Sequence, residues 1–154
     1  IADKLRNESP MIATETIDVV VSNCVLNLVA AELKPQLFGE LFRVLKPGGR
    51  AVISDIVGSD DVPETLQRDP ELWSGCISGA LREDRFLRAF ADAGFDPVRI
   101  LKRDESPWRK VGEMTFRSLT VEALKPGDSK TEKPSSTANY FMPSTGGGGG
   151  TSCC

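Results

Sequence analysis

The stretch Ile17–Leu28, IDVVVSNCVLNL, decides how the chain is organised. Its first five residues, Ile17–Val21, are β-branched and apolar except for Asp18. This pattern is typical of a strand buried on both faces of a parallel sheet. The apolar run then gives way to the small residues Ser22–Cys24, where such a strand would end. Ligands of open parallel α/β sheets bind outside the carboxyl ends of the strands, so we expect the thiol of Cys24 to contact a substrate.

A helix and a second strand are predicted to follow. Leucines recur every four residues, which marks one face of an amphipathic helix with Pro35 in its first turn. These leucines are Leu33, Leu37, Leu41 and Leu45. The run Lys46–Gly49, KPGG, predicts the end of the helix, because proline cannot continue it and glycine is free to turn. A second buried strand is predicted at Arg50–Ser54, ending at Asp55, whose carboxylate is interpreted as a solvated strand end. Strand, helix and strand with short links indicate a right-handed βαβ unit.

The rest of the ordered chain continues the alternation of helices and strands. A short helix is predicted near Pro63–Arg68 and a longer one at Glu83–Ala93, which Gly94 stops. Two further strands are predicted near Pro97–Arg103 and Met114–Leu124. Their order predicts an antiparallel hairpin that closes a mostly parallel sheet. The predicted fold class is therefore α/β.

The composition excludes several classes of protein. A length of 154 residues suits one domain, and 40% hydrophobic with 27% charged residues is ordinary for a globular protein. A net charge of −3 gives no sign of a nucleic-acid surface. No apolar run approaches the roughly 18–20 residues that cross a bilayer, and no secretory leader is visible. We therefore expect no nucleic-acid or membrane partner. Because Ile1 opens the chain in mid-pattern, we also expect an amino-terminal part to be missing.

Two internal cysteines are the candidate site residues. Cys24 could be a core residue, because free cysteine often behaves as a small buried hydrophobe. Cys76 lies between Gly75 and the pair Ser78-Gly79, which offer it little core. Both are predicted at one edge of the sheet, and a pair of thiols suits a soft, thiophilic ion or metalloid. The chain has no histidine, so any chemistry here proceeds without imidazole.

The chain changes character at Lys125. The segment 125–154 is polar and rich in Pro, Ser and Gly, with five consecutive glycines before Thr151. This predicts a disordered tail after a domain spanning 1–124. The tail ends in Cys153 and Cys154, which could be a loose end, a lipid attachment signal or a tethered thiol pair that captures a thiophilic ligand.

Five segments together resemble the arsenite S-adenosylmethionine methyltransferases. They are SNCVLNL (22–28), FRVLKPGGR (42–50), SDIV (54–57), DPELWSGCISGAL (69–81) and AGF (93–95). The LKPGG run alone marks class I methyltransferases in general, whereas SNCVLNL with a second cysteine in GCISGAL is far more specific. The similarity extends over about 1–124, and relatives often carry cysteines at the extreme carboxy terminus.

The resemblance implies a Rossmann-like class I methyltransferase sheet, here its carboxy-terminal half, that binds S-adenosylmethionine. It implies that As(III) is held by Cys24 and Cys76, with Cys153 and Cys154 as further candidate ligands. Ile1 and Ala2 match the place where the chain passes the adenine ring, and Asn23 would lie near the methyl end of the cofactor. The implied substrates are arsenite and methylarsenite, with a thiol reductant for turnover, in a cytoplasmic monomer.

Two features of the family have no match in this sequence: the Gly-rich cofactor loop and a further upstream cysteine. We therefore expect the chain by itself to be catalytically inactive. Two other functions stay open. One is a class I methyltransferase that acts on carbon or oxygen of another small molecule, with Cys24 incidental. The other is a non-catalytic protein that binds As(III) through its thiols.

Overall fold

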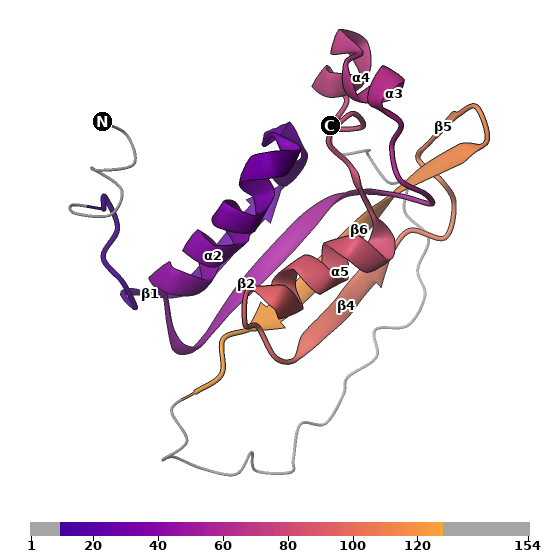
Figure 1. Cartoon of the computed structure of the whole chain (residues 1–154). Coiled ribbons are helices and arrows are strands. Elements are labelled where there is room, and N and C mark those ends of the chain that lie inside the picture. The colour runs from indigo at the N-terminus through magenta and orange to yellow at the C-terminus, as the bar shows by residue number, and fades with distance from the viewer. Residues whose placement is uncertain (1–9, 128–154) are drawn as a thin grey trace.

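The computed structural model describes residues 10–127 and shows one mixed α/β layer structure (Figure 1). Its sheet has six strands, and four of them follow the order β1-β2-β6-β4. The short strand β3 pairs with β2, and β5 pairs with β6. The strands are β1 (Ile17–Asn23), β2 (Leu45–Gly58), β3 (Leu81–Arg82), β4 (Val98–Arg103), β5 (Arg109–Val111) and β6 (Met114–Leu124).

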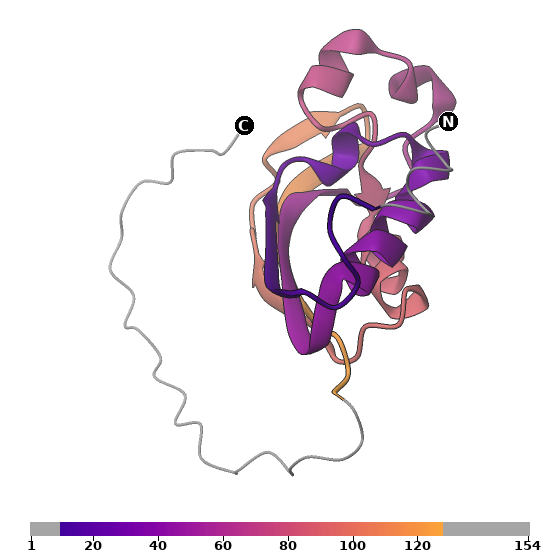
Figure 2. The same cartoon turned by 90° about the vertical axis from the view of Figure 1, so that its left-hand side faces the viewer.

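Two long helices cover one face of this sheet (Figures 1 and 2). They are α2 (Lys34–Val44) and α5 (Glu83–Asp92). Two 3-10 turns, η1 (Leu26–Leu28) and η2 (Ala31–Leu33), precede α2, and two short helices, α3 (Glu64–Gln67) and α4 (Pro70–Ser74), precede α5. The predicted long helices and the short helix near Pro63–Arg68 are thus confirmed within a few residues. Helix α4 was not expected; Asp69 caps it by accepting hydrogen bonds from two backbone N–H groups.

The predicted βαβ unit is confirmed, because β1 and β2 are parallel and α2 connects them. Two details of the prediction are wrong. The KPGG run lies inside β2, which begins at Leu45, and β2 continues past Asp55 to Gly58. Strand β2 extends past Asp55 because its backbone pairs with β6 without interruption from Arg50 to Gly58. This pairing continues through the polar residues Ser54 and Asp55. Gly48, with φ of 78°, provides the turn inside this long strand.

The predicted closing hairpin is also confirmed. Strands β4 and β6 pair antiparallel, and β6 lies between β2 and β4 rather than at the edge. The turn-rich segment between them contains β5, which the sequence pattern does not signal because it has only three residues.

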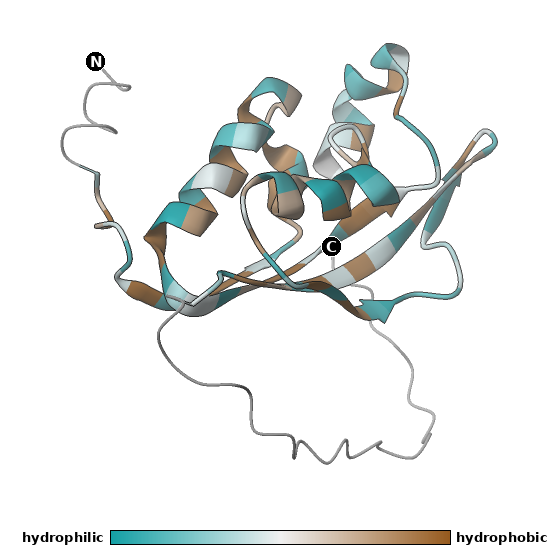
Figure 3. Ribbon diagram, turned by 60° about the horizontal axis from the view of Figure 1, so that its bottom comes forward, coloured by the Kyte–Doolittle hydropathy of each residue, from teal (hydrophilic) through white to brown (hydrophobic). Residues whose placement is uncertain are grey.

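The main core fills the space between the two long helices and the sheet, and Figure 3 shows hydrophobic residues on both layers. Four aromatic rings meet edge to face there, with centroids 4.8 to 6.4 Å apart. These rings belong to Phe38, Phe86, Phe90 and Phe95. Such pairs add about 0.5–1.5 kcal/mol each beyond the area that they bury. This packing fixes α2 and α5 relative to β2 and β6.

Strand β1 is not buried on both faces, so that expectation is wrong. It lies at the edge of the described sheet, next to β2 only. Val20 packs on the main core, whereas Val21 is 73% exposed and Val19 is exposed as well. The helices of the described chain cover one face of the sheet, so the other face of this apolar strand meets no partner layer there (Figure 2).

The first residue of the predicted tail, Lys125, is buried. Its ammonium donates to the carbonyl oxygens of Phe42 and Leu45 and pairs with Glu15 at 3.0 Å. The carboxy-terminal end of α2 is thereby tied to the end of β6. The rest of the predicted tail, 128–154, lies outside the described residues. Among residues 10–127, no helix is long and apolar enough to cross a membrane.

Candidate functional site

The two internal cysteines lie together at the carboxyl edge of the parallel strands. Cys24 follows β1, and its backbone N–H donates to Ser54 of β2 at 2.9 Å. Cys76 follows α4 and precedes β3. The thiol of Cys76 donates to the carbonyl oxygen of Cys24 across 3.4 Å. The convergence expected of these two loops is therefore observed, and both residues are thiols rather than disulfide sulfurs.

Both cysteines adopt a left-handed backbone conformation. Their φ angles are 53° at Cys24 and 58° at Cys76. A residue with a Cβ pays about 1–2 kcal/mol for this conformation, and such outliers concentrate at functional sites. Within residues 10–127, only Glu15 is a further residue other than glycine with positive φ. Two of the three non-glycine residues with positive φ in the described part of the chain are therefore the two internal cysteines.

Cys76 is nevertheless part of a core, contrary to the expectation that its neighbours offer none. It is 4% exposed and packs with Ile56, Ile77 and Phe116 in a second, smaller cluster. The expectation was wrong because it considered only the small residues beside Cys76: Ile77 is adjacent in sequence, and β2 and β6 add Ile56 and Phe116. Cys24 is half-buried at the rim of the same cluster.

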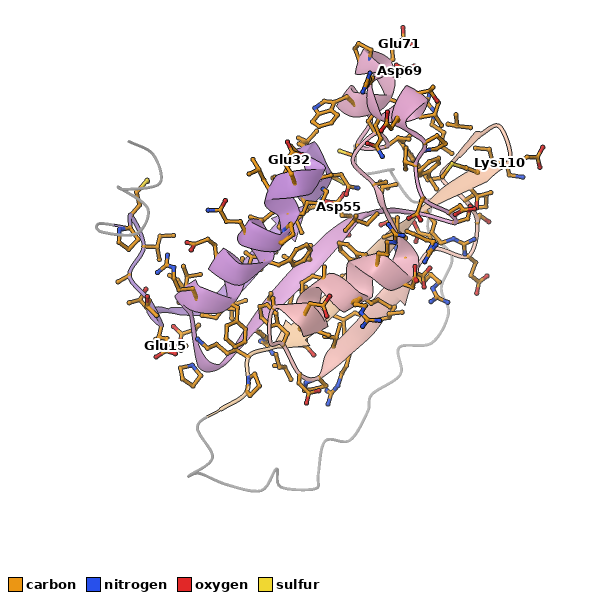
Figure 4. The ribbon with its side chains drawn as sticks, viewed as in Figure 1. Glu15, Glu32, Asp55, Asp69, Glu71 and Lys110 are labelled. Carbon is orange, nitrogen blue, oxygen red and sulfur yellow. The ribbon has the colours of Figure 1, made fainter. Side chains whose placement is uncertain are left out.

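A buried carboxylate organises the backbone beside Cys24. Asp55 of β2 is 1% exposed, so its interpretation as a solvated strand end is wrong. One carboxylate oxygen accepts hydrogen bonds from the backbone N–H groups of Leu26 (2.9 Å) and Asn27 (3.3 Å). The other accepts from the N–H of Ile56. Figure 4 places Asp55 between the amino-terminal end of α2 and the α4 segment.

A buried lysine completes this polar cluster. Lys34, the first residue of α2, donates from its ammonium to the carbonyl oxygen of Leu26 at 2.6 Å. Burial lowers its pKa to about 8, while the charges of Asp55 and Cys76 act in the opposite direction. Burial also raises the pKa of Asp55, against three backbone hydrogen bonds and Lys34, which lower it.

The other predicted site residues have different outcomes. Asn23 is exposed at the end of β1, and its side-chain oxygen accepts a 3.5 Å hydrogen bond from the thiol of Cys24. Ile1, Ala2, Cys153 and Cys154 lie outside the described residues. Between residues 10 and 127, no group of three or more His, Cys, Asp or Glu side chains could hold a metal ion. The described candidate ligands are therefore the two thiols.

Sequence reasoning missed Asn27 and Lys34. Asn27 is 2% exposed and lies in the 3-10 turn η1 after Cys24. A polar residue inside the apolar run VLNLVA could have signalled a buried hydrogen-bonding role. Nothing comparable marks Lys34, because a lysine at the start of an amphipathic helix is ordinarily solvated.

Comparisons with known proteins show the family to which the chain belongs. A family model described as a methyltransferase domain matches residues 4–94. The chain is 42% identical over 123 residues to an arsenite methyltransferase of Halobacterium salinarum, covering 75% of this chain and 31% of the relative. It is 35% identical over 120 residues to the human arsenite methyltransferase, covering 74% of this chain and 32% of the relative. The chain thus spans about a third of the length of these relatives.

A solved structure supports the same relationship. An arsenic(III) S-adenosylmethionine methyltransferase from Chlamydomonas reinhardtii superimposes with a TM-score of 0.68 at 31% identity. The match covers 79% of this chain and 42% of that one. By sequence and by architecture, the chain belongs to the methyltransferase domain family and has the Rossmann-like α/β fold of class I methyltransferases.

Proposed function

We propose that this chain carries the arsenic-binding part of an arsenite methyltransferase, with Cys24 and Cys76 as thiolate ligands of As(III). The observation that carries the proposal is the contact of the two cysteine loops, 3.4 Å from thiol to carbonyl, with both cysteines in a left-handed conformation. Relatives that match most of this chain are named arsenite methyltransferases, which supports the choice of substrate.

The two thiols suit the proposed chemistry. Thiolates are soft ligands that prefer soft centres, and As(III) bound to sulfur retains its lone pair. That lone pair forms the new As–C bond, the C–S bond of the methyl donor breaks, and its electron pair stays on the departing sulfur. No proton moves at the arsenic atom, so a site without histidine can carry out this step. Holding arsenic and methyl carbon in line can contribute about 7–11 kcal/mol.

S-adenosylmethionine, when bound, would supply the electrophilic methyl group. The described residues fit one side of such a site: Asn23 presents an exposed amide beside Cys24 at the carboxyl edge of the sheet. We propose that Asn23 lies near the methyl end of the cofactor and that Ile1 and Ala2 pass its adenine ring. The thiolates of Cys24 and Cys76 would hold the substrate against that end.

The oxidation state of arsenic adds a further requirement. Methyl transfer oxidises arsenic by two electrons, so a thiol reductant must restore As(III) at each round, and two thiols become one disulfide. We propose arsenite and methylarsenite as substrates, the cytoplasm as the compartment and a monomer as the active form. The two thiols of the site support the compartment, because reducing compartments preserve them.

The first prediction concerns methyl transfer by the complete gene product. We expect Cys24→Ser and Cys76→Ser each to lose at least about a hundredfold in transfer from S-adenosylmethionine to arsenite, because a hard oxygen replaces a soft ligand. Cofactor binding, measured by calorimetry, should remain. Ser59→Ala, on the exposed loop after β2, is the matched control and should retain activity. Unchanged transfer in either cysteine variant would contradict the proposal.

A further inference from the structure

Asn27 lies between the two cysteine loops and joins them. Its side-chain amide donates to the carbonyl oxygen of Cys76 at 3.1 Å and to that of Ile56 at 2.7 Å. Its backbone N–H is held by Asp55, which also binds the preceding residue of the loop that carries Cys24. One buried side chain therefore connects the first cysteine loop, the end of β2 and the second cysteine itself.

A second contact docks the same two loops independently of that side chain. A Cβ atom built on Gly79 would lie 1.9 Å from the carbonyl oxygen of Asn27 and 2.9 Å from its carbonyl carbon. Real Cβ atoms essentially never come so close, so the backbone of the loop that carries Cys76 rests directly on the backbone at Asn27. The approach is possible because residue 79 has no side chain.

These contacts bear on arsenic because two ligands bind one ion only at a fixed separation. Each cysteine lies in a strained left-handed conformation, which persists only where its surroundings enforce it. The side-chain amide of Asn27 donates a hydrogen bond to the carbonyl group of Cys76. That carbonyl carbon is bonded to the Cα atom of Cys76, where the backbone is strained. Without that hydrogen bond the loop could relax, and arsenite binding would then have to reorder it.

We propose that Asn27 is a positioning residue that sets the separation of the Cys24 and Cys76 thiols and so determines the affinity for arsenite. This role rests on the proposed function and goes beyond it, because Asn27 is a buried residue that is not one of the proposed arsenic ligands. It acts through the backbone carbonyl group of Cys76. Residues that support metal ligands in this way typically contribute 10–100-fold in affinity, and we expect a loss of about that size when Asn27 is changed.

The test is an arsenite titration of the full chain, followed by arsenic–sulfur absorption, with Cys153→Ser and Cys154→Ser as background. Asn27→Ala should bind arsenite about 10–100-fold more weakly. Ser78→Ala is the matched control: the Ser78 hydroxyl lies in the same loop and donates to two other carbonyl groups, those of Leu66 and Asp69. It should change affinity less than about threefold, since it does not touch the contact between the loops.

Two further measurements separate positioning from a loss of fold. Asn27→Ser keeps a hydroxyl donor and should lose less affinity than Asn27→Ala, which keeps the test open if the alanine variant does not fold. In the complete gene product, Asn27→Ser should raise the KM for arsenite while the KM for S-adenosylmethionine stays within about twofold of the parent. A general loss of structure would move both constants.

The outcomes are distinct. If the parent binds arsenite and folded Asn27 variants bind it equally well, Asn27 is not a positioning residue, although the proposed function stands. If the Asn27 and Ser78 variants weaken binding equally, the positioning role also fails. If the parent itself does not bind arsenite, the proposed function fails and this role falls with it.

Discussion

At the scale of single residues, the buried ammonium of Lys34 predicts how stability depends on pH. Its pKa is about 8 in the folded chain against 10.5 for an ordinary lysine, so folding penalises the charged form. The unfolded chain binds more protons between these two values, and stability must therefore rise with pH across this window. The penalty is fully present below pH 8 and absent above 10.5, a change of about 3 kcal/mol.

Lys34→Met tests this dependence by removing the titrating group while keeping the apolar length of the side chain. From pH 8 to 10.5, the urea-unfolding free energy of the parent should gain about 3 kcal/mol relative to the variant. Asp55 and Cys76, the charged groups that couple to Lys34, are present in both chains. Parallel stability curves for the two chains would show that Lys34 is not a penalised buried charge.

The candidate site also shows what single residues reveal in sequence. The convergence of Cys24 and Cys76 could be predicted from the place of Cys24 after a predicted strand and of Cys76 in a loop of small residues, because the edge of a parallel sheet is a property of topology. Asp55, Asn27 and Lys34 could not be assigned in the same way. Their hydrogen bonds run through η1 and the loop that carries Cys76, which come together only when the chain folds.

At the scale of elements, the surroundings of two glycines predict opposite effects on stability when each is replaced by alanine. Gly79→Ala would drive a Cβ into the carbonyl group of Asn27, and such overpacking typically costs about 1–3 kcal/mol. Gly39→Ala, in the exposed middle of α2, meets no atom within 4 Å. It should raise stability by about 0.5–1 kcal/mol, because alanine favours the helix. Urea unfolding of both variants checks this prediction, and equal effects of the same sign would contradict it.

Most of the helices and strands could be predicted from the sequence. Helix α2, helix α5 and strand β6 follow directly from their hydrophobic periodicity and from the residues that end them. The length of β2 could not be predicted, because pairing with β6 extends the strand beyond its run of hydrophobic residues. The short α4 depends on one capping carboxylate, and β3 on pairing with the end of β2.

At the scale of the whole molecule, helices cover one face of the sheet in the described chain, and an apolar strand lies at its edge (Figure 2). The apolar residues of Ile17–Val21 predict a central strand buried on both faces. Val19 and Val21 are instead exposed. The sequence shows that a strand is apolar, but it does not show whether helices cover both faces of that strand. The chain spans about a third of the length of the curated relatives it matches.

We propose above that two loops of this α/β layer form one arsenic site. X-ray absorption at the arsenic edge, on the full chain with one equivalent of arsenite and with Cys153 and Cys154 replaced by serine, counts the sulfur ligands directly. We predict at least two sulfur ligands per arsenic in this parent and one fewer in each of Cys24→Ser and Cys76→Ser. An unchanged sulfur count after either substitution would remove that cysteine from the site and contradict the account.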